Sequence, residues 1–196
     1  ISAILITHEH TDHTKTVGIF SKKYHVPVYA NSQTWAAISA EQTEKVAEEN
    51  GKLFSVDETF DIGDLHIFPF HIPHDAANPC GFNVFQGNTK ISIATDLGHM
   101  TPSVFKKLEK SSFILLESNY EPEVLKFSKY PYALKKRIDG PNGHLSNIIA
   151  GRTISKLIPL GLASAMLRTS KQRKQLSRTC LSDRFKRTRK RPHNNT

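Results

Sequence analysis

Seven residues near the start of the chain, with the sequence THEHTDH, carry three histidines and two carboxylates. His8 and His10 stand two residues apart, directly after the apolar run 2–6, so both imidazoles can turn toward one point. Asp12 and His13 follow one short turn later and can serve a neighbouring point. Neutral imidazole suits zinc, and a carboxylate adds negative charge and a bridging oxygen. The motif therefore predicts a metal site, with a histidine-rich polar loop as the simpler alternative.

Two later side chains of the same chemical type also follow expected strands. His74 comes directly after a strand expected at 65–72, and Asp96 after one expected at 90–95. Loops that begin where buried strands end hold reactive groups on a rigid scaffold. A carboxylate in such a place can bridge two metal ions about 3.5–4 Å apart. We therefore expect His74 and Asp96 to join the THEHTDH motif in one centre.

The elements that must position these side chains can be read from apolar patterning and turn signals. Strands are expected at 2–6, 27–30, 52–56, 65–72, 81–86, 90–95 and 113–117, and helices at 14–24, 32–38, 41–50, 102–109, 121–138 and 145–157. Strands and helices alternate first, then a β-meander follows, and then strand and helix alternate again. This order predicts an α/β sandwich of sheets flanked by helices.

Six stretches resemble the metallo-β-lactamase superfamily, and within it the YycJ/WalJ group of exonuclease-like bacterial metallohydrolases. They are THEHTDH, IPHDAANPCGF, IATDLGH, LESN, PYALKKRI and GHLSN. The resemblance covers residues 1–158 and implies a metallo-β-lactamase αββα sandwich with a two-metal site at its sheet edges. It implies two ligand sets that share a bridging carboxylate: His8, His10 and His74 for one ion, Asp12 and His13 for the second, and Asp96 between them. Zinc is the expected ion, and manganese is the alternative.

Two further residues are candidates for proton transfer. Glu117 ends the expected strand 113–117, and His144 stands at the start of an expected helix. In similar tRNA-processing nucleases of the superfamily, a glutamate at such a strand end orients a histidine that protonates the leaving oxygen. A leaving 3′-hydroxyl needs a proton, and a paired imidazole with a near-neutral pKa can donate one. With Asp12 they form the predicted catalytic set, whereas a helix cap and a loop support are the alternative roles.

The function that the resemblance implies is phosphodiester hydrolysis of nucleic acid, DNA or RNA, at a dinuclear zinc site. Lys135, Lys136 and Arg137 close an expected helix near His144 and are candidates for phosphate contact. A solvated helix end is the simpler explanation for that triplet. The alternative enzyme is a glyoxalase-type thioester or acyl hydrolase, which shares the HxHxDH pattern. Lactam-hydrolysing relatives often carry cysteine where this chain has Asp96, which weakens a β-lactamase interpretation.

The net charge of +9 is unevenly distributed along the 196 residues. Residues 160–196 hold 11 of the 27 Lys and Arg and one of the 18 acidic residues, so the remainder is nearly neutral. We expect two parts: a partial fold at 1–158 and a basic, disordered tail at 159–196. The chain starts at Ile1 in a strand, and the family pattern fades near residue 158, so the fold is expected to be incomplete at both ends. A shifted reading frame would explain the tail, and a native basic arm that binds nucleic acid is the alternative, with an inactive fragment as a further possibility.

Cysteine content and hydropathy indicate the compartment. Cys80 and Cys180 stand far apart and predict neither a disulfide framework nor a cysteine metal site. No apolar run approaches the ~18 residues of a membrane span. A cytoplasmic location without membrane contact is expected.

Overall fold

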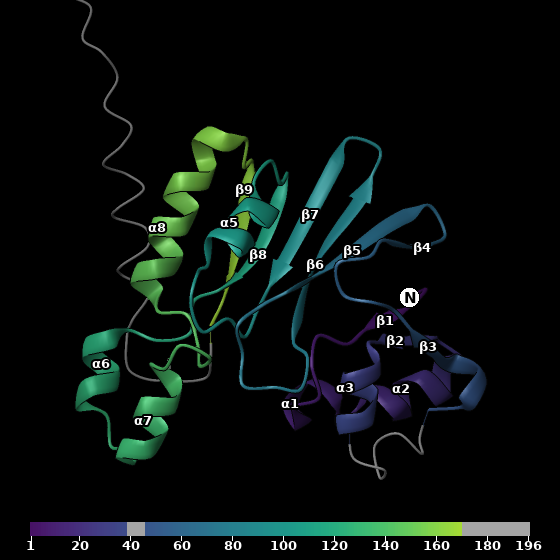
Figure 1. The fold of residues 1–196 in the computed structure, drawn as a ribbon, viewed down its shortest axis with the longest axis horizontal. Coiled ribbons are helices and arrows are strands. Elements are labelled where there is room, and N and C mark those ends of the chain that lie inside the picture. The colour runs from purple at the N-terminus through teal and green to yellow at the C-terminus, as the bar shows by residue number, and fades with distance from the viewer. Residues whose placement is uncertain (39–45, 170–196) are drawn as a thin grey trace, which may run out of the picture.

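The computed structural model describes residues 1–38 and 46–169 of the chain (Figure 1). The strands are β1 (Ile4–Leu5), β2 (Val28–Ala30), β3 (Gly51–Leu53), β4 (Phe60–Ile62), β5 (Leu65–His71), β6 (Cys80–Gln86), β7 (Thr89–Ala94), β8 (Phe113–Glu117) and β9 (Ser164–Arg168). The helices are α1 (Thr11–Thr14), α2 (Val17–Tyr24), α3 (Ser32–Ala37), α5 (Pro102–Leu108), α6 (Pro122–Phe127), α7 (Tyr132–Ile138) and α8 (Asn147–Leu157). Two 3₁₀ turns, η1 (Glu48–Asn50) and η2 (Ile158–Leu160), complete the described elements.

The strands form two sheets. β1, β2 and β3 make a parallel three-stranded sheet, and the other six strands form a mixed sheet in the order β4-β5-β6-β7-β8-β9. In the mixed sheet β4 to β7 pair antiparallel, whereas β7, β8 and β9 run parallel. The carboxyl ends of parallel strands meet at one edge, so the last residues of β7, β8 and β9 lie close together.

Three apolar clusters show how the layers stack. Ile67, Cys80 and Phe82 of the mixed sheet pack with Phe54 and with side chains of β1 and β2, which places this cluster between the sheets. Phe70 is three residues after Ile67, so it lies on the opposite face of β5, because side chains alternate along a strand. It packs with side chains of α5 and α8.

The third cluster joins β1 and β2 to α2 and α3. Figure 1 shows α5 and α8 on the side of β8 and β9, and α1, α2 and α3 gathered around β1–β3. Helices therefore cover the outer face of each sheet, and the α/β sandwich of sheets flanked by helices that the sequence predicts is confirmed.

Side-chain caps fix where three helices begin. Asn31, Thr101 and Ser146 each accept a hydrogen bond from the backbone N–H three residues later, at the starts of α3, α5 and α8. The Ser146 cap fixes the first turn of α8, and His144 lies just before that turn. The cap therefore helps to position a candidate catalytic side chain.

Several expected boundaries were wrong. The helix expected at 121–138 is two helices, α6 and α7, because Pro131 disfavours helical backbone in the residue before it and stands as the N-cap of α7. The helix expected at 14–24 begins later, because α2 starts at Val17, and Thr14 instead ends the short helix α1. Of the helix expected at 41–50, residues 41–45 lie outside the described part, and 48–50 form η1.

The sheet continues beyond residue 158, where the sequence analysis placed the end of the fold. β9 pairs parallel with β8 from Phe113↔Ser164 to Glu117↔Arg168. The boundary at 159 is therefore too early, because backbone pairing to a buried strand compensates for the weak apolar pattern of this short segment. Residues 170–196 lie outside the described part, so a disordered basic tail there stays a prediction.

One close backbone approach yields a prediction about stability. A Cβ on Gly98 would lie 2.2 Å from the backbone oxygen of Pro141, whereas a Cβ on Gly151 of α8 would meet nothing within 4 Å. Gly98→Ala should lower the free energy of unfolding by about 1–3 kcal/mol, because two loops must separate. Gly151→Ala, the matched control, should raise it by about 0.5–1 kcal/mol through helix propensity. Urea denaturation measures both, and a Gly98→Ala variant as stable as wild type would contradict this packing.

Candidate metal centre

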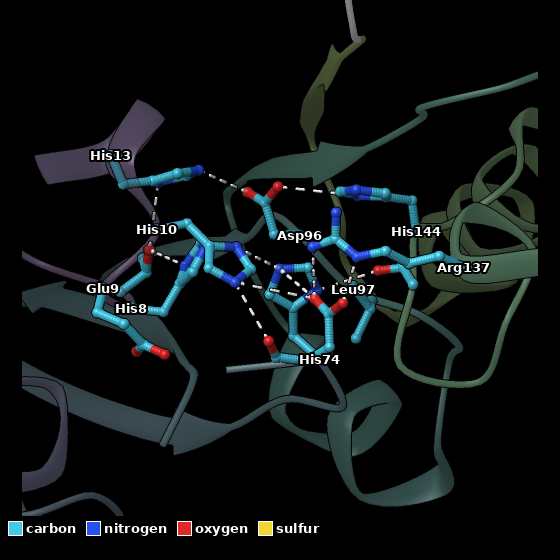
Figure 2. A network of polar contacts seen from close by, with 12 residues as sticks. His8, Glu9, His10, His13, His74, Asp96, Leu97, Arg137 and His144 are labelled. Carbon is cyan, nitrogen blue, oxygen red and sulfur yellow. Dashed lines mark hydrogen bonds and ion pairs between the residues drawn. The ribbon is translucent and has the colours of Figure 1, made fainter. Parts of the chain in front are cut away.

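The predicted ligands meet where several strands end (Figure 2). His8 and His10 follow β1, and His13 lies on α1. His74 follows β5, and Asp96 follows β7. Three groups of side chains have ligand atoms within 4.8 Å of one another: His8, His10 and His74; His8, His13 and Asp96; and Asp96, Glu117 and His144. The fold thus brings side chains from distant parts of the sequence to one place.

In the first group, hydrogen-bond partners determine which ring nitrogen of His10 and of His74 carries the proton. His10 Nε2 donates to the carbonyl of Asp75 (3.2 Å), and His74 Nδ1 donates to the carbonyl of Gly143 (3.1 Å). A carbonyl only accepts, so each neutral ring has its one N–H committed. His10 Nδ1 and His74 Nε2 then face each other as two lone pairs, 3.3 Å apart. Two lone pairs cannot hydrogen-bond to each other, and a cation between them resolves the conflict.

This geometry fits a zinc ion. Two nitrogens bound at ~2.0–2.1 Å to one tetrahedral zinc lie about 3.3 Å apart, which is the observed separation. His8 offers a third nitrogen: its Nδ1 lies 2.9 Å from the Thr7 hydroxyl, and its buried Nε2 has no hydrogen-bond partner among the described residues. Carbonyl and hydroxyl groups that hold the remote nitrogen are the usual support of histidine ligands.

The electrostatics keep these imidazoles in the form that binds metal. Burial, followed by repulsion from His13 and His74, lowers the pKa of His8 to about 3. Burial also lowers the pKa of His74, although its hydrogen bond to Gly143 and the nearby carboxylates oppose this. Both rings are therefore neutral at physiological pH, with lone pairs available for a cation.

The second group is arranged differently. Asp96 Oδ2 lies 3.2 Å from His13 Nε2 and also accepts a hydrogen bond of 2.6 Å from Arg168 Nη1 at the end of β9. Burial alone would raise the pKa of Asp96, but contact with His13 and the charges of His13 and Arg168 lower it well below its usual range. Asp96 is thus an ionised carboxylate that already has a cationic partner.

Asp12 is not brought into these groups. Its side chain is 70% exposed, and its nearest carboxylate oxygen lies 3.7 Å from His13 Nε2. The expected role of Asp12 as a ligand and catalytic residue stays a prediction, which this arrangement does not favour.

Glu117 and His144 form the pair expected for proton transfer. His144 Nδ1 donates to Glu117 Oε1 at 2.8 Å, and the buried carboxylate also accepts from the backbone N–H groups of Leu97 and Leu145. Burial would lower the pKa of His144, but its hydrogen bond to Glu117 and the charges of Glu117 and Asp96 raise it. With Nδ1 fixed, Nε2 is the atom that can hold a proton for a substrate.

The three basic residues of α7 have different partners. Arg137 donates to the Asp75 carboxylate from Nε (2.5 Å) and Nη2 (3.2 Å), and Figure 2 shows it beside the site. Lys135 Nζ donates to the Lys126 carbonyl, and Lys136 Nζ lies 5.2 Å from the centre of the Tyr132 ring. Of the three, only Arg137 therefore contacts a residue next to a candidate ligand, because Asp75 follows His74.

Arg168, Thr7 and Asp75 were not identified from the sequence. Arg168 was assigned to the basic tail, and the mostly apolar stretch 162–167 before it, which includes Ser164, was only a weak strand signal. Thr7 and Asp75 stand inside the recognised motifs, but their contacts depend on which way each imidazole ring turns. That orientation is a property of the folded loops.

Comparison with known proteins agrees with this geometry. A family model described as the β-lactamase superfamily domain matches residues 1–159. The chain belongs to the metallo-β-lactamase superfamily. It is 33% identical over 158 residues to exodeoxyribonuclease YycJ of Bacillus anthracis, a match that covers 81% of this chain and 60% of the relative. It is 34% identical over 148 residues to exodeoxyribonuclease WalJ of Streptococcus pneumoniae, covering 75% and 55%.

The fold is also that of a solved superfamily structure. The metallo-β-lactamase fold protein YhfI of Bacillus subtilis matches with a TM-score of 0.62 at 19% identity, over 85% of this chain and 64% of that one. The sequence identities to YycJ and WalJ confirm the predicted relationship to the YycJ/WalJ group. The chain spans about 60% or less of the length of the two exodeoxyribonucleases. Among residues 1–38 and 46–169, no helix combines the length and apolar character needed to cross a membrane.

The contacts of Glu117 predict a strong response to a small change. Its two oxygens accept four hydrogen bonds, from Leu97, Asn119, His144 and Leu145. Glu117→Gln puts an NH₂ group where only acceptors fit, so buried donors lose partners and the free energy of unfolding should fall by about 1–3 kcal/mol or more.

Urea denaturation with EDTA present measures this effect without a metal contribution. Glu123→Gln, the same change at an exposed position in the first turn of α6, is the control and should alter stability by less than about 0.5 kcal/mol. Equal stability of the two variants would show that the Glu117 contacts are not as described.

Proposed function

We propose that this chain is a metal-dependent phosphodiesterase that acts on nucleic acid, and on DNA in particular. The observation that carries the proposal is the pair of facing lone pairs on His10 and His74, 3.3 Å apart beside the buried Nε2 of His8. This arrangement calls for a cation, and the Glu117–His144 pair adjoins it. The names of the YycJ and WalJ relatives support a DNA substrate.

The first ion would be held by His8, His10 and His74, with zinc as the expected metal and manganese as the alternative. A bound divalent ion supplies Lewis acidity, which stabilises negative charge on a phosphoryl oxygen and activates water at neutral pH. The second ion expected from the sequence would need His13, Asp12 and Asp96. At this second site, however, Arg168 already contacts the Asp96 carboxylate.

His144 has the chemistry of the proton donor. Glu117 accepts the Nδ1 proton and fixes the ring, so Nε2 carries the second proton of the imidazolium. The leaving 3′-oxygen takes that proton as the P–O bond breaks. Glu117 acts through His144 and is a positioning residue.

Arg137 is the best candidate among the three basic residues for contact with a phosphate. Its guanidinium is about half exposed and has donors beyond the two that Asp75 occupies. Lys135 contacts the backbone of α6 and Lys136 contacts an aromatic ring of α7, so both would contribute charge only at longer range.

The metal assignment predicts a loss of zinc on removal of one ligand. His74→Ala should reduce the zinc retained after dialysis to less than about a tenth of the wild-type value, because three ligands become two. His66→Ala removes an exposed histidine that pairs with Asp61, and it should retain zinc fully. Elemental analysis of both proteins decides the matter, and equal zinc content would exclude His74 as a ligand.

The proton-donor assignment predicts a kinetic defect that is independent of metal content. His144→Ala should slow cleavage of a DNA oligonucleotide by about 10²–10⁴-fold and leave bound zinc unchanged. An oligonucleotide with a better leaving group at the scissile bond should recover most of this loss, which a purely structural defect would not show. A chain that hydrolyses lactoylglutathione and leaves DNA and RNA intact would instead be the thioester hydrolase.

A further inference from the structure

A guanidinium lies next to the carboxylate of Asp96. Arg168 Nη1 lies 2.6 Å from Asp96 Oδ2, and the same oxygen lies 3.2 Å from His13 Nε2. These are the atoms that a second metal ion would need. Arg168 therefore competes with that ion for Asp96 Oδ2.

The position of Arg168 is fixed by the sheet. β9 pairs parallel with β8, Arg168 is in register with Glu117, and the Arg168 carbonyl accepts a 2.8 Å hydrogen bond from the Ser118 N–H. Asp96 follows β7, the other parallel neighbour of β8. The carboxyl ends of three parallel strands thus place Asp96, Glu117 and Arg168 at one edge.

The chemistry of arginine maintains the competition between Arg168 and a metal ion for Asp96 across the physiological pH range. A guanidinium has no lone pair to offer a metal and keeps its charge at every physiological pH. A divalent ion at His13 and Asp96 would meet this charge directly and would lose the carboxylate oxygen that Arg168 occupies. Asp12, the remaining expected ligand, is 70% exposed and lies outside the group formed by His8, His13 and Asp96.

We propose that Arg168 takes the place of the second metal ion, so that the chain holds one divalent ion, at His8, His10 and His74. This inference rests on the proposed metal site. Asp96 belongs to the His13 group and not to the group of His10 and His74, so the first site keeps its ligands. The Arg168 side chain is 43% exposed, so it has donors left for a phosphate oxygen and supplies part of the positive charge of the missing ion.

Zinc stoichiometry tests the proposal without any activity assay. The purified chain is dialysed to equilibrium against buffered free Zn²⁺, and zinc and protein are quantified in the same sample. Wild type should bind one zinc per chain, and Arg168→Gln should bind two over the same range of free zinc. Arg168→Lys keeps a positive charge and should stay close to one. Arg152→Gln removes an equal charge from an exposed position on α8 and should bind one zinc.

The outcomes separate this inference from the proposed function. Two zinc ions on wild type, or one on Arg168→Gln, would overturn the role of Arg168 and leave the first site standing. No zinc on any of the proteins would overturn both. Arg168→Met, which keeps the length of the side chain without its charge, repeats the test if Arg168→Gln shows no cooperative unfolding.

Discussion

A carboxylate buried away from water must have every oxygen satisfied, and the site depends on how Glu117 meets that requirement. One oxygen accepts the backbone N–H groups of Leu97 and Leu145, so the loop after β7 and the loop before α8 are tied to the end of β8. The other oxygen accepts from Asn119 and His144. Leu97 is adjacent to Asp96, and Leu145 is adjacent to His144. A single buried charge thus sets the distance between the candidate ligand and the candidate proton donor.

The charges of the site divide into two halves. Around Asp96, a buried carboxylate is balanced by Arg168, with His13 at 3.2 Å. Around His10 and His74, both N–H groups are committed to carbonyls, and nothing among the described side chains supplies a positive charge between the two facing lone pairs. One half therefore has a built-in cation, and the other half has the unpaired nitrogens of the candidate metal site.

Much of this arrangement follows from the sequence, and the reasons for success and failure are physical. The His-x-His spacing after an apolar run, and single polar residues at later strand ends, predict that His8, His10, His74 and Asp96 lie close together, as they do, because strand ends meet at one edge. The break between α6 and α7 could have been read from Pro131. β9 could not be predicted with equal ease, because a short strand with exposed Ser164 and Met166 owes its place to pairing with β8. Ring orientations in the histidine cluster depend on carbonyls from distant loops, which no local pattern specifies.

β9 also determines which side chain lies beside the candidate metal site. Asp96, Glu117 and Arg168 stand at or just after the ends of β7, β8 and β9, so the residue at the end of β9 decides what faces the Asp96 carboxylate. A metal-binding side chain there would complete a second ligand set, whereas an arginine fills that place with its own charge. Pairing with β8 uses main-chain groups, so it does not depend on the side chain at residue 168. The fold thus provides an edge at which a single side chain determines whether the second positive charge comes from the protein or from a metal ion.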